Sequence, residues 1–197
     1  MGRTVDFYWE VGSTNSYFAL HLLRPVAARH GAAIRYIPIN LGHVFRHHNY
    51  VLMEEPEAKI ANRIRDLERW AEHYRLPFRF PTTFPIKTSR ALRGAIAMRR
   101  WDKEVAFIDA IFAAYWERDD ASIRHYAGLR PIAEGLGVDP DDFEAAAESE
   151  ECRAALIEAT DSALARGVFG APTMIVGDEI FWGKDRMDFV ERELAKG

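Results

Sequence analysis

Segments that favour β-strand occur only near the two ends of this chain. At the start, apolar and β-rich runs at 4–11 and 34–39 flank an amphipathic stretch that reaches His30. Ser13 to Ser16 are good helix-capping residues before that stretch, and Gly31 suits the position just after it. The start of the chain therefore predicts a strand–helix–strand unit with a right-handed crossover.

At the other end, 172–176 and 179–182 are two short predicted strands across a turn at Gly177 and Asp178. Asp185 is predicted to cap a last helix over 186–196. Because strands lie only at the two ends, any sheet must combine both ends of the chain.

The long middle, from 54 to 166, carries helical patterning. Three prolines, at 77, 81 and 85, break it with a connection that is neither regular helix nor central strand. The predicted helices cover 56–74, 88–101, 103–116, 122–135, 140–147 and 149–165.

The resulting order is βαβ, then helices, then ββα. This order predicts an α/β, thioredoxin-like fold with a large helical insertion. We expect residues 1–42 and 163–197 to form the thioredoxin-like domain and residues 43–162 to form the inserted helical domain.

Cysteine content restricts the chemistry, because Cys152 is the single cysteine among 197 residues. An internal disulfide and a CxxC redox pair are both excluded, and Cys152 itself is expected to be a small helix residue. The sequence has no signal-peptide pattern and no apolar run of membrane-spanning length, so we expect a cytoplasmic protein with no membrane partner.

Charge is unevenly distributed although the net value is only −4. Residues 1–103 carry 17 basic and 9 acidic side chains, whereas 104–197 carry 9 and 21. The basic excess lies in 59–103 and suits a small anion or a solvated surface equally well. The negative total argues against a nucleic-acid partner.

The turn Ser13-Thr14-Asn15-Ser16 occupies the place where redox thioredoxin-like proteins carry CxxC. Dithiol exchange needs a thiolate and is excluded here. A serine hydroxyl and free amides at a helix N-terminus can instead hold the thiolate of a ligand. The alternative is that Ser13 is only a helix cap.

A second feature is the segment at 167–183, GVFGAPTMIVGDEIFWG. Proline immediately before a strand cannot donate to the sheet, so its position has meaning. We predict a cis bond between Ala171 and Pro172 that faces Ser13. In the turn that follows, Asp185 and nearby amides suit either a substrate's charged ends or a simple helix cap.

Four blocks together resemble a known family: DFYWEVGSTNSYFA, DLERWAEHYRLPFRFP, FPIKTSRALRG and GVFGAPTMIVGDEIFWGKDRMDFVE. They are similar to the 2-hydroxychromene-2-carboxylate isomerases, relatives of the kappa-class glutathione transferases and of DsbA. The resemblance runs over nearly the whole chain and implies the same thioredoxin-like fold with a helical insertion.

The resemblance also implies a glutathione site. Ser13 matches the serine that hydrogen-bonds the glutathione sulfur, and Ala171 with Pro172 matches the site that pairs with its cysteinyl backbone. Lys184 and Asp185 match the turn that holds the γ-glutamyl end. Supporting positions are Trp182 and Arg186, and we expect Trp9 and Trp182 to flank the site.

The same resemblance places substrate-contacting residues at Lys59, Asn62 and Lys87. The family's usual residues differ at four positions, which here are Thr14, Asn62, Lys87 and Lys184. These departures surround the expected acceptor pocket.

The function implied is that of a glutathione-dependent isomerase, which acts on an unsaturated aromatic carboxylate. The resemblance also implies that the protein is a homodimer. A kappa-type glutathione transferase and a non-catalytic binding protein on the same fold are the alternatives. We expect no metal, because the i,i+4 pair His43 and His47 has no further ligand at a typical spacing and the segment after Gly42 is expected to be irregular. Ser13 also lacks the G-x-S-x-G elbow of a hydrolase nucleophile.

Overall fold

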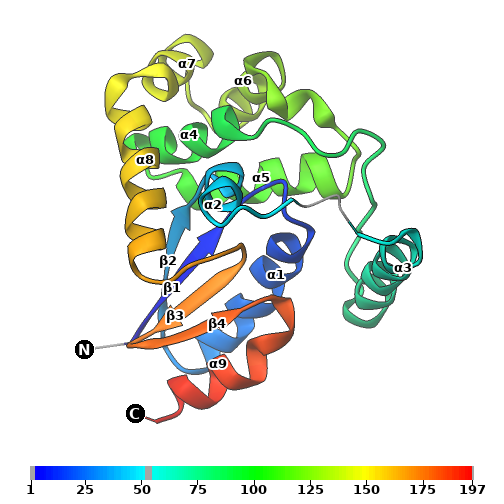
Figure 1. Ribbon diagram of the computed structural model, residues 1–197. Helices are drawn as coiled ribbons and strands as arrows, with labels where there is room; N and C mark the ends of the chain where they lie inside the picture. The colour runs from blue at the N-terminus through cyan, green and yellow to red at the C-terminus, as the bar shows by residue number, and fades with distance from the viewer. Residues whose placement is uncertain (1–2, 52–54, 197) are drawn as a thin grey trace.

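The computed structural model of the protein describes residues 3–51 and 55–196. Its four-stranded sheet has the order β2-β1-β3-β4, so strands from opposite ends of the chain are neighbours at its centre (Figure 1). β1 pairs in parallel with β2 and antiparallel with β3, which in turn pairs antiparallel with β4. The strands are β1 (Thr4–Trp9), β2 (Ala33–Pro38), β3 (Thr173–Val176) and β4 (Glu179–Trp182).

The helices match the predicted pattern closely, and the βαβ…ββα order with an inserted helical block is confirmed. Two predicted helices each include a short 3₁₀ segment. The α-helices are α1 (Thr14–Arg29), α2 (Leu41–His47), α3 (Glu57–Tyr74), α4 (Ser89–Ala97), α5 (Glu104–Trp116), α6 (Tyr126–Gly135), α7 (Pro140–Glu148), α8 (Glu150–Ala165) and α9 (Met187–Leu194); the 3₁₀ helices are η1 (Met98–Trp101), η2 (Ala121–Arg124) and η3 (Lys184–Arg186).

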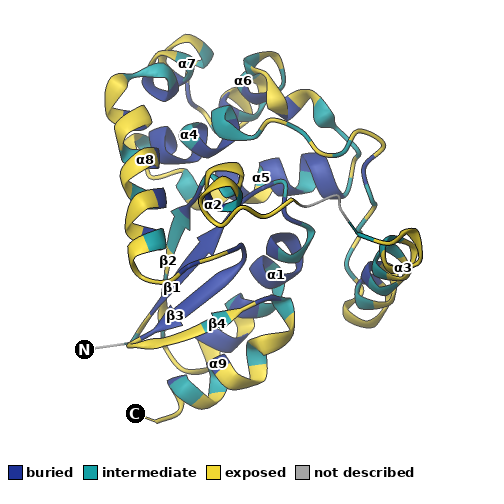
Figure 2. Ribbon diagram, in the orientation of Figure 1, coloured by how far each residue is buried: buried dark blue, intermediate teal, exposed yellow. Residues whose placement is uncertain are grey.

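The sheet separates two apolar layers, as alternation along β1 requires. Val5, Phe7 and Trp9 face the main core, which includes the buried faces of α1, α4 and α5. Tyr8 faces a smaller cluster with Ala163 of α8. Figure 2 shows the central strands β1 and β3 and helix α1 largely buried, whereas β4 and the outer faces of α3, α7 and α8 are exposed.

One tryptophan of α5 forms a hydrogen bond that connects the helical block to the end of β1. The indole N–H of Trp116 donates to the carbonyl oxygen of Val11 at 2.6 Å. Three phenylalanines of the proline-rich connection pack around the same indole, and they are Phe78, Phe80 and Phe84. The residue Val11, just after β1, is therefore tied to α5 and, through Trp116, to the proline-rich connection.

Asp6 is a buried charge within β1 that joins three elements. Its carboxylate accepts hydrogen bonds from Arg35 of β2 and from Arg166, which follows α8, each at 2.6 Å. Burial alone would raise the pKa of Asp6, but the two arginines outweigh it and hold the pKa below its usual value. A satisfied ion cluster therefore fixes the edge of the sheet to α8.

Two local predictions are wrong. The segment after Gly42 was expected to be irregular, but it forms α2, because the side-chain oxygen of Asn40 accepts the His43 amide at 3.0 Å. Asp185 does not cap the last helix. Gly183, at φ 104°, turns the chain into η3, so α9 starts later, and the Asp185 carboxylate pairs with Arg186 at 2.5 Å.

Within the described residues, no helix combines the length and apolar character that crossing a bilayer requires. Those residues also contain no group of three or more histidine, cysteine or acidic side chains placed around a metal. His43 lies 3.7 Å from Asp161 instead. Cys152 is buried on α8, where its amide donates to the N-cap Ser149.

Candidate active site at the start of helix α1

Ser13 stands between the end of β1 and the start of α1 and is 7% exposed. As N-cap of α1, its hydroxyl oxygen accepts the Ser16 amide at 3.2 Å. The same hydroxyl donates to the carbonyl oxygen of Ala171 at 2.9 Å. This second bond joins two residues that lie near opposite ends of the sequence, so Ser13 does more than cap a helix.

The peptide bond between Ala171 and Pro172 is cis, and it faces Ser13 as predicted. The carbonyl of Pro172 accepts the Gly183 amide at 3.0 Å, which holds the segment against β4. Ala171 is left as a backbone acceptor that points at the serine hydroxyl. The structure therefore brings three of the predicted site residues together.

The N-terminus of α1 adds electrostatic attraction for an anion. Thr14 and Asn15 are the first two residues of the helix, and their amides have no acceptor within it. The dipole of the 16-residue helix places partial positive charge at the same end. An anionic ligand beside Ser13 would meet donors and favourable potential together.

Lys184 brings a full positive charge to the same helix end. Its ammonium donates to the side-chain oxygen of Asn15 at 3.1 Å and lies 4.6 Å from the centre of the Trp70 ring. Trp70 belongs to α3, which Figure 1 shows apart from the other inserted helices and near α1. Burial lowers the pKa of Lys184, and Asp66 and Asp185 oppose that shift. Lys184 therefore links η3, the segment between β4 and α9, to α1 and α3.

Glu10 lies in the turn before Ser13 and is 4% exposed. Burial raises the pKa of its carboxyl to about 7, although hydrogen bonds from the Thr88 hydroxyl and the Gly12 amide act in the opposite direction. One carboxyl oxygen, Oε1, has no hydrogen-bond partner among the described residues. The turn thus holds an acid that titrates near neutral pH.

The remaining residues of the β4–α9 block lie at the surface. Trp182 is 46% exposed and packs against Phe169 and over Gly170, where a Cβ atom would lie 2.7 Å from the indole nitrogen. Asp185 and Arg186 are exposed and pair with each other. Trp9 is fully buried against Phe112, so of the two tryptophans expected to flank the site only Trp182 is at the surface.

The three predicted substrate residues are exposed. Lys59 and Asn62 lie on α3, where the Lys59 ammonium pairs with Glu55 at 2.8 Å. Lys87 is exposed immediately before Thr88. In the described part of the chain, no hydrogen bond connects any of these three residues to Ser13.

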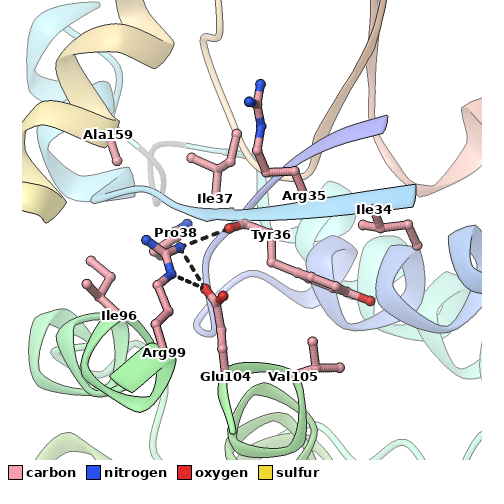
Figure 3. Close-up of a pocket in the computed structure, with 10 residues that line it drawn as sticks. All are labelled: Ile34, Arg35, Tyr36, Ile37, Pro38, Ile96, Arg99, Glu104, Val105 and Ala159. Carbon is pink, nitrogen blue, oxygen red and sulfur yellow. Dashed lines mark hydrogen bonds and ion pairs between the residues drawn. The ribbon is translucent and has the colours of Figure 1, made fainter. Parts of the chain in front are cut away.

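A cavity of about 460 Å³ lies along the edge strand β2, away from these residues. Figure 3 shows Arg99 reaching across it to the carbonyl oxygen of Tyr36 at 3.1 Å and to Glu104 at 2.7 Å. None of the predicted site residues lines this cavity. The cavity is a groove between the sheet edge and the helical block. Arg99 already forms hydrogen bonds with two of its polar groups, the Tyr36 carbonyl and the Glu104 carboxylate.

Comparison with known proteins agrees with this geometry. A DSBA-like thioredoxin domain model matches residues 4–195. A 2-hydroxychromene-2-carboxylate isomerase of Sphingobium xenophagum is 36% identical over 98% of this chain and 99% of its own. The chain belongs to the 2-hydroxychromene-2-carboxylate isomerase family. A solved structure of such an isomerase superposes with a TM-score of 0.87 at 31% identity, covering 98% of this chain and 95% of that one.

The family has a more distant relative in the transferases. Glutathione S-transferase kappa 1 of Caenorhabditis elegans is 26% identical over 94% of this chain and 88% of its own. Enzymes of both kinds therefore share this fold over nearly its full length, which supports an enzymatic role for this isomerase-family member.

Sequence reasoning missed Glu10 and Thr88 as parts of the site. Glu10 did carry a signal, because it is an acidic residue at the end of an apolar strand segment. Thr88 gave none, since its role depends on which helix packs beside the turn. Asn15 was placed in the serine turn, but its bond to Lys184 was not predicted.

Proposed function

We propose that this protein is a glutathione-dependent isomerase that acts on an unsaturated aromatic carboxylate such as 2-hydroxychromene-2-carboxylate. The observation that carries the proposal is the bond between the Ser13 hydroxyl and the Ala171 carbonyl at the N-terminus of α1. It is supported by 36% identity to an isomerase of that name over nearly the whole chain.

Glutathione fits the residues at this turn. Its thiol suits a helix N-terminus with a hydroxyl, and its peptide amide suits the backbone carbonyl of Ala171, which accepts only the Ser13 hydroxyl among the described residues. When bound, it supplies a thiolate that adds to an electrophilic carbon of the acceptor and later leaves unchanged. The work of the protein is then to ionise and orient the thiol and to position the acceptor.

Ser13 and Ala171 would exchange partners when the ligand arrives. The Ser13 hydroxyl donates its single proton to the Ala171 carbonyl. A cysteinyl amide paired with this carbonyl would compete with the hydroxyl for it, and the Ser13 hydroxyl would then rotate to donate to the sulfur. The amides of Thr14 and Asn15 and the charge of Lys184 favour the anionic sulfur.

The other positions complete the proposed site. Pro172 shapes the backbone contact, and Trp182 and Asp185 would border the glutathione peptide. For the acceptor carboxylate we assign Lys59, Asn62 and Lys87. The reacting atoms would meet between a thioredoxin-like domain, residues 1–42 and 163–197, and a helical domain, residues 43–162.

Calorimetric titration with glutathione tests the proposal, followed by an isomerisation assay with 2-hydroxychromene-2-carboxylate. The matched control for Ser13→Ala is Ser149→Ala, because Ser149 also caps a helix and also donates to a carbonyl, at 2.7 Å. We expect binding and turnover in the Ser149 variant and at least tenfold lower turnover in the Ser13 variant. Absence of glutathione binding at millimolar concentration would refute the proposal.

A transferase of the kappa type is the second candidate, favoured by the full-length match to kappa 1. Glutathione binding without isomerisation, together with conjugation of an electrophilic aryl halide, would identify it. The proposed homodimer is tested separately by light scattering.

A further inference from the structure

The buried acid Glu10 takes no part in the chemistry proposed for Ser13 and Ala171. Its backbone is fully used, since its carbonyl accepts the Ser13 amide at 3.1 Å and its amide donates to the Ser16 hydroxyl at 3.4 Å. Its carboxyl is different, because Oε1 is buried and lacks any partner within the described residues. Buried polar atoms are normally hydrogen-bonded, so this one needs an explanation.

The surroundings of the carboxyl contain no compensating positive charge among the groups that act on it. At the residue before α4 it meets the neutral hydroxyl of Thr88, and in its own turn it meets the amide of Gly12. From α5 it acts on Tyr115, whose pKa is raised by burial and by the Glu10 charge, so the phenol stays neutral. An ionised Glu10 is therefore costly, and a proton on Oε1 removes the cost.

The carboxyl also belongs to the same turn as the proposed thiolate. Its Oε2 atom is 3.0 Å from the place where a Cβ atom would lie on Gly12, the residue immediately before Ser13. Two negative charges in one low-dielectric site disfavour each other, so a thiolate at Ser13 favours the neutral form of Glu10. Burial already brings the pKa of Glu10 to about 7, where a modest influence decides its protonation.

We propose that Glu10 is the resident proton acceptor of the site: Oε1 takes up the proton that a thiol loses when it binds beside Ser13. The S–H bond of the ligand breaks and an O–H bond forms on ionised Glu10. The negative charge thereby passes from the Glu10 carboxylate to the sulfur, and no proton need reach the solvent. This inference rests on the proposed function.

Proton counting tests it without measuring turnover. Glutathione binding to wild type and to Glu10→Gln is measured by calorimetry at about pH 7.5, in two buffers of different ionisation enthalpy. Ultraviolet absorbance of the thiolate is recorded on the same solutions. We expect the glutamine variant to release about one proton per thiolate formed, and the wild type to release at least about half a proton less.

Two controls isolate the effect. Asp178→Asn removes an exposed acid from the hairpin turn and should behave like wild type. S-methylglutathione has no thiol proton, so the difference between wild type and Glu10→Gln should vanish with it. If the glutamine variant fails to fold, infrared difference spectra of wild type provide the second measurement, because glutathione binding should increase the band of a protonated carboxylic acid.

The outcomes separate the two claims. Equal proton release from wild type and Glu10→Gln, with the thiolate formed in both, would overturn the role of Glu10 and leave the proposed function intact. An unchanged infrared band would do the same. Absence of binding, or a bound thiol that stays protonated in wild type, would overturn the proposed function itself.

Discussion

Replacing Glu10 by glutamine should make the protein more stable above neutral pH and have little such effect in mild acid. Burial raises the pKa of the folded carboxyl from 4.5 to about 7, so the folded state binds a proton more tightly than the unfolded chain does. The stability linked to the neutral form is complete below about pH 4.5 and is lost as the pH rises through 7. Glutamine stays neutral and escapes that loss.

The size of the effect follows from the two pKa values. A shift from 4.5 to about 7 corresponds to a loss for wild type of about 2.5 kcal/mol between pH 5 and pH 8.5. The advantage of the glutamine variant should therefore grow by about that amount over the same range, whatever its value at pH 5. Using the change with pH cancels any fixed difference in hydrogen bonding between the two side chains.

Urea unfolding at a series of pH values measures this directly, with Asp178→Asn as the exposed control. We expect the free energy of unfolding of Glu10→Gln to fall less steeply toward alkaline pH than those of wild type and the control. Parallel curves for all three proteins would show that Glu10 has an ordinary pKa and would remove the physical basis of its proposed role.

Three further changes test other parts of the structure. Gly128→Ala should lower the free energy of unfolding by about 3 kcal/mol or more, because the new Cβ would lie 2.4 Å from the backbone of Ser122; a loss below about 1 kcal/mol in urea unfolding would contradict that packing. Asp6→Asn should cost about 1–3 kcal/mol at neutral pH, and the difference should shrink in acid as wild-type Asp6 protonates; a difference independent of pH would contradict the ion cluster. Lys184→Met should weaken glutathione binding roughly 3- to 10-fold in a titration while leaving the fold intact; unchanged affinity would mean that this charge serves only to pack against Trp70.

Local signals explain why much of the fold was predictable. An apolar, β-rich run and a helix cap define β1 and α1, and a proline before a short strand defines the approach of Ala171 to Ser13. These features depend on residues close together in the chain, and the order of strands then fixes how they meet. The resemblance to the isomerase family added the meaning of the serine turn.

The parts that sequence did not reveal depend on distant contacts. The burial of Glu10 requires Thr88 of the helical block, and the place of Lys184 requires Trp70 of α3. Neither pairing has a signature in local spacing. The last helix shows the same limit, because Asp185 pairs with Arg186 instead of capping the helix, which starts at Met187 after the short segment η3.

The structure also explains the uneven distribution of charge between the two halves of the chain. Basic side chains of the first half pair with acidic ones of the second half inside one chain. Such pairs include Arg24 with Asp109 at 2.6 Å, Arg29 with Glu191 at 2.9 Å and Arg100 with Glu151 at 2.5 Å. Exposed pairs of this kind each contribute at most about 1 kcal/mol, so the uneven charge adds little to the stability of the fold.

The ionisation of bound glutathione tests the central claim most directly. Thiolate absorbance is followed against pH for glutathione bound to wild type, Ser13→Ala and Ser149→Ala. The account predicts that the bound thiol has a pKa at least about one unit below the ordinary cysteine value of about 8.5 in wild type and in the Ser149 variant, and closer to that ordinary value in the Ser13 variant. A bound thiol that titrates identically in all three proteins would contradict the role of Ser13 and the function built on it.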